Sequence, residues 1–142
     1  LPASKKNAYK NKDKKKKVIK GQGTVLLIDD EEMIIKVCSR MMEVLGYTVL
    51  TALGGREALK LYKKNIDKID LVILDMVMPD LDGPATYSKL QEINPDIKVL
   101  LASGYSSSEQ AQKLLELGCC SFIEKPFNMK EISEKINEVI NN

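Results

Sequence analysis

The stretch that decides the fold is LVILDMVMPDLDG, residues 71–83. Its first four residues, 71–74, are all apolar, and a strand without polar positions is typical of a parallel sheet that is buried on both faces. An Asp-rich loop follows, and Pro84 then opens a helix at a position where its missing N–H is harmless. This stretch therefore predicts a central strand of an α/β sheet and the helix after it.

Runs of the same kind recur on both sides of this stretch, and each is followed by a segment with helical periodicity. The expected strands are residues 24–29, 47–52, 71–74, 97–102 and 120–123, and the expected helices are residues 31–45, 56–65, 84–94, 106–117 and a last one from 128. The second and fifth runs contain polar residues, which is typical of edge strands. We therefore predict a doubly wound, flavodoxin-like α/β fold: a five-stranded parallel sheet of order 2-1-3-4-5 with five helices on both faces.

The predicted helices carry end signals and an apolar pattern. Gly46 closes the first helix where a left-handed backbone is needed, and Asn128 with Glu131 three residues later fits a capping box for the last one. Apolar residues recur at helical spacing in the first helix: Ile34, Val37, Met41 and Val44. Such a pattern is typical of an amphipathic helix that packs on a sheet.

The charge of the chain is divided unevenly along its length. The 142 residues have a net charge of +2, but residues 1–20 hold nine lysines and one aspartate, a net charge of +8, so residues 21–142 carry −6. We therefore expect a basic linker or tail over residues 1–20 and one domain over residues 21–142.

Several classes of protein are excluded by composition. The chain has no histidine, which rules out Ser-His-Asp and Cys-His catalysis, histidine-bound metals and a phosphohistidine on these residues. Three cysteines, two of them adjacent, make neither a disulfide framework nor a zinc site. No apolar run approaches the length of a membrane span, and the lysine-rich start does not resemble a secretory signal, so we expect a cytoplasmic protein.

Polar residues follow the expected strands at one edge of the sheet: Asp29, Asp30, Asp75, Ser103 and Lys125. Ligands of such a sheet bind beyond the carboxyl ends of the strands, where the strand order reverses between the first and third strands. Clustered carboxylates repel one another unless they bind a proton or a cation, and Mg²⁺ prefers oxygen ligands. A cation and a lysine that face a free carboxylate predict a phosphoryl-transfer site with an Asp as the acceptor.

Each of these residues also has an ordinary structural interpretation, because an Asp after a strand most often caps a helix or belongs to a turn. We interpret Asp82, which precedes Gly83, as a turn residue and Asp80 as a solvated one. The joint placement of five suitable residues at strand ends favours chemistry over these interpretations.

Four segments end or begin at the expected strands: LLIDDEE (26–32), LVILDMVMPDLDG (71–83), VLLASGY (99–105) and FIEKPF (122–127). In this order and spacing they resemble the receiver domain of two-component response regulators. The resemblance covers residues 24–140, practically the whole domain, and it implies phosphorylation of an aspartate with Mg²⁺ as the cofactor.

The resemblance implies a role for each acidic residue. Asp75 would be the phosphorylated aspartate, Asp30 would bind Mg²⁺ directly, and Asp29 would act through a hydrogen bond or a water molecule. Asp75 and the backbone carbonyl of Val77 would complete the protein ligands of the metal.

The resemblance also implies a switch. Lys125 would contact the phosphoryl oxygens, and its peptide bond to Pro126 would be cis. Ser103 would move to hydrogen-bond the phosphoryl group. Phe122 stands where the family has an aromatic residue whose rotamer follows that movement, although an ordinary edge-strand aromatic is an equal interpretation.

Two positions would set the lifetime of the phosphoaspartate, Val77 and Tyr105. In the family the equivalent residues tune hydrolysis. An apolar side chain and a bulky ring impede an attacking water and offer it no base, so we expect slow self-dephosphorylation.

The function implied is a phosphoacceptor that catalyses its own phosphorylation and dephosphorylation but is not a kinase. A histidine kinase phosphodonor domain, in the same chain or in another, would supply the group, and a histidine phosphotransfer protein could take it further. A stand-alone single-domain response regulator and a phosphorylation-independent docking module are the alternatives, and a homodimer stays open. The DDEE segment departs from the nucleophile motif of aspartyl-phosphate phosphatases, and the phosphate loop of flavodoxin-like cofactor binders is absent.

The first residues, LPASKK, resemble the end of the ATP-binding domain of sensor histidine kinases. In hybrid kinases a charged linker and a receiver follow that domain, so the resemblance implies the C-terminal receiver of a hybrid sensor histidine kinase. The lysine run 14–17 has no interleaved aromatic residues beyond Tyr9, and we interpret it as a solvated linker rather than a nucleic-acid contact. We expect no membrane contact from this domain.

Overall fold

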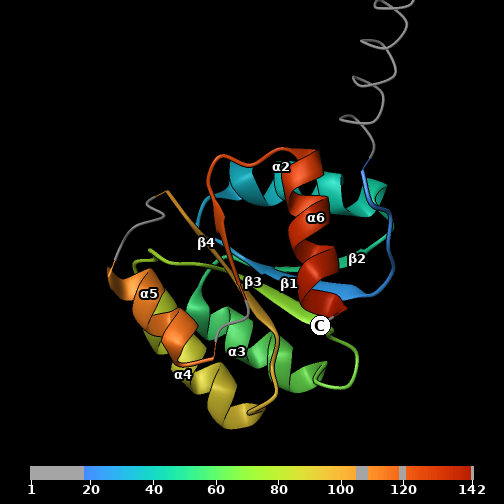
Figure 1. Ribbon diagram of the computed structural model, residues 1–142. Helices are drawn as coiled ribbons and strands as arrows, with labels where there is room; N and C mark the ends of the chain where they lie inside the picture. The colour runs from blue at the N-terminus through green and yellow to red at the C-terminus, as the bar shows by residue number, and fades with distance from the viewer. Residues whose placement is uncertain (1–17, 105–108, 119–120, 142) are drawn as a thin grey trace, which may run out of the picture.

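The computed structural model describes residues 18–104, 109–118 and 121–141 (Figure 1). Its strands are β1 (Thr24–Ile28), β2 (Thr48–Ala52), β3 (Leu71–Asp75), β4 (Val99–Ser103) and β5 (Ser121–Glu124), and its helices are α2 (Glu32–Val44), α3 (Gly55–Lys64), α4 (Gly83–Ile93), α5 (Glu109–Glu116) and α6 (Met129–Ile140). The five strands form one parallel sheet of order β2-β1-β3-β4-β5. Helices α2 and α6 cover one face and α3, α4 and α5 cover the other, so the predicted fold is confirmed.

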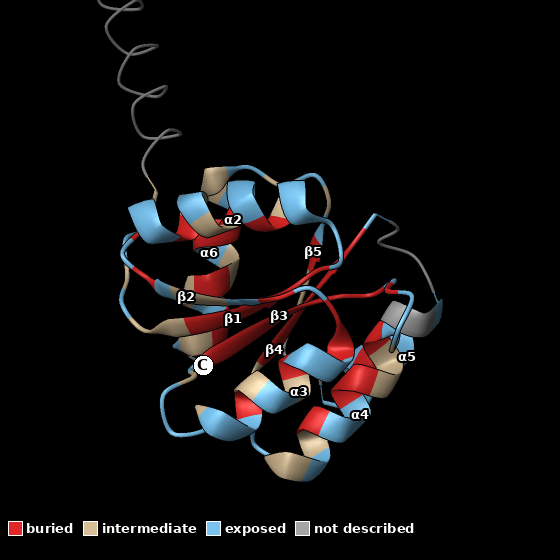
Figure 2. Cartoon of the chain, turned by 180° about the vertical axis from the view of Figure 1, so that it is seen from behind, coloured by how far each residue is buried: buried red, intermediate tan, exposed pale blue. Residues whose placement is uncertain are grey.

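The three central strands are the apolar ones. Every residue of β3 and β4 is buried, as are the last four of β1, whereas both edge strands contain partly or fully exposed positions (Figure 2). Ile28 pairs with Leu74 and Asp75 pairs with Ala102, so the central strands end at nearly the same level. Whatever follows these strands must therefore meet at one edge of the sheet.

The expected helix ends are largely confirmed. Gly46 and Gly118 have left-handed φ angles of +109° and +115° after α2 and α5. Asn128 and Glu131 form the predicted capping box of α6. Asp82, interpreted as a turn residue, caps α4 by accepting the N–H of Ala85 at 2.9 Å.

The prediction for the face of α2 is wrong. Its buried residues are Ile35, Cys38 and Met42, with Leu45 just beyond, whereas Val37 and Val44 are 53% and 61% exposed. The predicted residues Ile34 and Met41 are only partly buried. Two apolar stripes of equal period run along α2 one residue apart, and periodicity alone does not say which of them packs on the sheet. The helix therefore keeps an apolar outer face.

Candidate functional site

Three aspartates gather where β1 and β3 end. Asp75 is the last residue of β3, and Asp29 and Asp30 directly follow β1 on the neighbouring strand. Asp29 and Asp75 are only 2% and 7% exposed, whereas Asp30 is exposed. Each of the three offers a carboxylate oxygen, and these oxygens lie within 4.8 Å of one another. The sheet has thus brought together the acidic residues that the sequence placed at strand ends.

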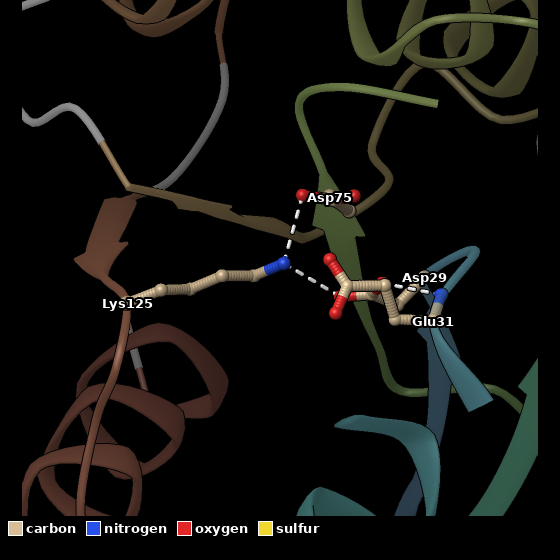
Figure 3. A network of polar contacts seen from close by, with 4 residues as sticks. All are labelled: Asp29, Glu31, Asp75 and Lys125. Atoms are coloured by element: carbon tan, nitrogen blue, oxygen red, sulfur yellow. Dashed lines mark hydrogen bonds and ion pairs between the residues drawn. The ribbon is translucent and has the colours of Figure 1, made fainter. Parts of the chain in front are cut away.

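Lys125 reaches this cluster from the far edge of the sheet, just after β5 (Figure 3). Its Nζ donates to Asp29 Oδ2 at 2.6 Å and to Asp75 Oδ1 at 2.9 Å. The other oxygen of Asp29 accepts the N–H of Glu31 at 3.0 Å, which fixes the orientation of that carboxylate. Lys125 is itself held because its N–H donates to the Ser103 carbonyl, and its peptide bond to Pro126 is cis.

The electrostatics of the cluster reflect its burial. Desolvation raises the pKa of Asp75, and the hydrogen bond and charge of Lys125 only partly offset this effect. Burial acts to lower the pKa of Lys125, but the hydrogen bonds and charges of Asp29 and Asp75 outweigh it, so the net shift is upward. The lysine therefore stays protonated. Because burial disfavours the ionised form of Asp75, a further cation would stabilise that form more than it would stabilise an exposed carboxylate.

The remaining predicted residues lie around this cluster. Ser103 ends β4 next to Asp75 and is buried. Phe122 on β5 is partly buried and packs against the core beneath α3, α4 and α5. Val77, two residues after Asp75, is 73% exposed. Tyr105 lies outside the residues that the structure describes.

The donor set fits a magnesium ion. Asp29, Asp30 and Asp75 supply only oxygen atoms, and Asp30 faces solvent, which lets water complete a coordination shell. Three carboxylates face one ammonium group here, so the cluster keeps excess negative charge. When bound, a magnesium ion would supply the positive charge that phosphoryl oxygens need. The structure thus supports Asp30, Asp29 and Asp75 as the residues that would hold it.

Magnesium binding should stabilise the fold. At about ten times the dissociation constant, we expect about 1.4 kcal/mol of stabilisation and a rise of about 5 °C in the melting temperature. Asp30→Asn should remove most of this rise without disturbing the core, because Asp30 is exposed. Differential scanning fluorimetry with and without MgCl₂ measures the rise in melting temperature of the unaltered protein and of the variant. Asp67→Asn, an exposed acid outside the cluster, is the control, and an equal rise in Asp30→Asn would contradict this site.

Comparison with known proteins identifies the family. Residues 25–137 match the response regulator receiver domain. The chain belongs to this family. Every site residue described above lies within the matched range. Among the solved structures, a response regulator receiver domain protein from Clostridium thermocellum superposes with a TM-score of 0.80 and 32% identity, over 84% of this chain and 94% of that one. A chain of the CheX–CheY–BeF3–Mg²⁺ complex from Borrelia burgdorferi superposes with a TM-score of 0.79 and 28% identity, over 82% of this chain and 88% of that one.

One relative of this receiver domain is part of a much longer protein. The sensor kinase CckA of Brucella abortus is 34% identical over 133 residues, which make up 94% of this chain but 14% of that kinase. The chain also matches transcriptional regulators, and it spans just under half of the length of each of them. Among the residues described, no helix of this receiver domain has the length and apolar character to cross a membrane.

Sequence reasoning missed a groove beside the cluster. Met33, Val37 and Met41 of α2 line it together with Pro126 and Phe127, and Lys125 is also among its lining residues. Its lining is almost entirely apolar. The spacing of Met33, Val37 and Met41, four residues apart, was a signal in the sequence, but it was indistinguishable from that of a buried face.

Proposed function

We propose that this receiver domain accepts a phosphoryl group on Asp75 from a phosphohistidine and passes between two conformations as a result. The observation that carries the proposal is the bridge from Lys125 to both Asp29 and Asp75, since it combines a buried carboxylate with a fixed cation at the switch point of the sheet. Family membership supports the same assignment.

The proposed reaction uses these residues in distinct ways. An oxygen of the Asp75 carboxylate attacks phosphorus, a P–O bond forms, and the P–N bond to the donor histidine breaks with its electron pair leaving on nitrogen. Lys125 Nζ lies 2.9 Å from Asp75 Oδ1, so it is within reach of the phosphoryl oxygens and neutralises part of their charge. Asp29 holds Lys125 in place through the 2.6 Å contact. Asp29, Asp30 and Asp75, with the Val77 carbonyl, would hold a magnesium ion as the cofactor.

The proposed switch begins at Ser103. Its hydroxyl stands at the end of β4, beside the strand that carries Asp75, and would turn toward a phosphoryl group there. Phe122 is on β5, the neighbour of β4 on its other side, so a shift of Ser103 would be transmitted to Phe122 through packing alone, because the ring has no hydroxyl.

The proposed partners are helical proteins that carry the histidine. The apolar groove between α2 and the residues after β5 lies next to Lys125, so a helix that docks there brings its own side chains to Asp75. Because these 142 residues contain no histidine, both the donor and any later acceptor lie outside them. A histidine kinase phosphodonor domain and a histidine phosphotransfer protein fit this requirement.

We further propose that the domain is the receiver of a hybrid sensor histidine kinase, with residues 1–20 as the linker before it and residues 21–142 as the receiver. The similarity to the sensor kinase CckA over 94% of the chain supports this context, as does the LPASKK segment. Such a domain would work in the cytoplasm, where ATP is available to the kinase.

The proposed phosphoryl transfer is tested with phosphoramidate, a small donor that has a P–N bond. The domain should take up one phosphoryl group from it, and uptake by a variant that lacks the Asp75 carboxylate would contradict the proposal.

The lifetime of the phosphorylated state gives a separate prediction. Val77 is exposed beside Asp75 and offers no hydrogen bond to an attacking water. We expect the double variant Val77→Asn with Tyr105→Glu to lose its phosphoryl group at least about tenfold faster, since it gains polar groups that can position and activate water. Release of inorganic phosphate from the isolated phosphoprotein measures the rate. An unchanged rate would rule out these positions as the determinants.

A further inference from the structure

The loop that carries Val77, residues 76–83, is tied to the sheet at its start, and its end is tied to its start. The N–H of Met76 donates to the Ala102 carbonyl at 3.1 Å, and the N–H of Gly83 donates to the Met76 carbonyl at 2.9 Å. The approach is so close that a Cβ on Gly83 would lie 2.8 Å from the Cα of Met76. These contacts fix where the loop starts and ends, but not the position of the residues between.

Asp80, at the outer end of the loop, ties it to a different element. Its two carboxylate oxygens accept the backbone N–H groups of Gly55 and Arg56, each at 3.2 Å. These are the first two residues of α3, whose N-cap residue is Gly54 and which has no side-chain cap of its own. Asp80 therefore supplies the missing cap from the loop. Desolvation acts to raise the pKa of its carboxyl, but the hydrogen bonds from backbone N–H groups, those of Arg56 and Gly55 among them, together outweigh it and hold that pKa below its usual value.

The two segments are also in close steric contact. A Cβ on Gly54 would lie 2.7 Å from Asp80 Oδ2, and one on Gly55 would lie 2.8 Å from the Cβ of Leu81 and would overlap the hydroxyl of Thr86. The Thr86 hydroxyl in turn donates to the Leu81 carbonyl at 3.1 Å. A Cβ on Gly55 would meet both Leu81 and Thr86, and one on Gly54 would displace the Asp80 carboxylate, so the close approach of the loop to α3 favours glycine at both positions.

We infer that Asp80 is a positioning residue for the metal site: by holding the loop against α3, it keeps Val77 and its carbonyl next to Asp75. The inference rests on the proposed function, in which the Val77 carbonyl completes the ligands of the magnesium ion. The contact also works in the opposite direction, because a ligand that prefers the anchored loop must stabilise the N-terminus of α3 by the same free energy. Occupancy of the site is thereby coupled to α3, which lies on the opposite face of the sheet from α2.

The experiment measures magnesium affinity by isothermal titration calorimetry in matched variants. Asp80→Ala should bind Mg²⁺ about fivefold more weakly, the loss expected for a missing helix cap. Asp80→Asn, which keeps one acceptor oxygen, should recover most of that affinity. Asp82→Asn is the control, because Asp82 lies in the same loop and carries the same charge but caps α4 instead of α3. Circular dichroism verifies that each variant is folded.

Amide hydrogen exchange supplies a readout that does not depend on phosphorylation. Added Mg²⁺ should slow exchange of the Gly55 and Arg56 amides in the unaltered protein and in Asp82→Asn, and it should not do so in Asp80→Ala. A folded Asp80→Ala variant that binds Mg²⁺ as tightly as Asp82→Asn would overturn the inference. An exchange rate of the Gly55 and Arg56 amides that does not change when Mg²⁺ is added to the unaltered protein would overturn it as well. If the unaltered protein passes both tests yet takes up no phosphoryl group, the proposed function fails and the role of Asp80 stands.

Discussion

We expect Asp75→Asn to take up no phosphoryl group from acetyl phosphate, whereas the unaltered domain should gain the mass of one. The amide has nearly the shape of the carboxylate and its oxygen can still accept from Lys125, so the site keeps its geometry. It has no anionic oxygen to attack phosphorus, and Asp29, the other buried acid of the cluster, is occupied by Lys125 and by the N–H of Glu31. Intact-mass spectrometry measures the result.

Asp82→Asn is the matched control for this variant. It makes the same chemical change seven residues along the chain, at a side chain that only caps α4, and it should be phosphorylated like the unaltered protein. A phosphoryl adduct on Asp75→Asn, with the control behaving normally, would show that the acceptor is another residue.

Lys125→Met should have two large effects of opposite sign. Removing the ammonium group takes away a fixed positive charge from the transferred group, and we expect phosphorylation to slow by about 100-fold. The same change leaves Asp29 and Asp75 without the cation that now bridges them, so the cluster should bind Mg²⁺ more tightly. Reactions with acetyl phosphate that are quenched at successive times give the rate of phosphorylation. Isothermal titration calorimetry gives the affinity for Mg²⁺.

Opposite changes in rate and affinity separate a chemical role of Lys125 from a structural one, because a collapsed site would lose both. Lys135→Met is the control: Lys135 lies on α6, is partly exposed, and contacts Ser121 and Glu138 at 3.5 and 3.7 Å, away from the cluster. Weaker Mg²⁺ binding by a folded Lys125→Met would contradict the account.

Much of the fold could be predicted because its central strands are unambiguous. Residues 71–74 are apolar without interruption, as burial on both faces demands, and the polar positions of β2 and β5 mark the edges. Once the strand order is set, parallel register alone brings Asp29 next to Asp75. The cluster therefore followed from topology, without knowledge of side-chain contacts.

What could not be predicted depends on contacts between distant segments. The two apolar stripes of α2 have the same period, so only packing against β1 and α6 shows that Cys38 and Met42 are inside and Val37 is outside. The sequence indicates a solvated Asp80, and Asp80 is exposed, but its carboxylate caps a helix that starts 25 residues earlier. No local pattern encodes such a partner.

The most direct test of the central claim is the mass of the unaltered domain, and of its peptide containing residues 71–83, after incubation with acetyl phosphate in the presence and absence of Mg²⁺. The account predicts one phosphoryl group, located on Asp75 and formed only when Mg²⁺ is present. No adduct under either condition, or an adduct outside that peptide, would contradict it.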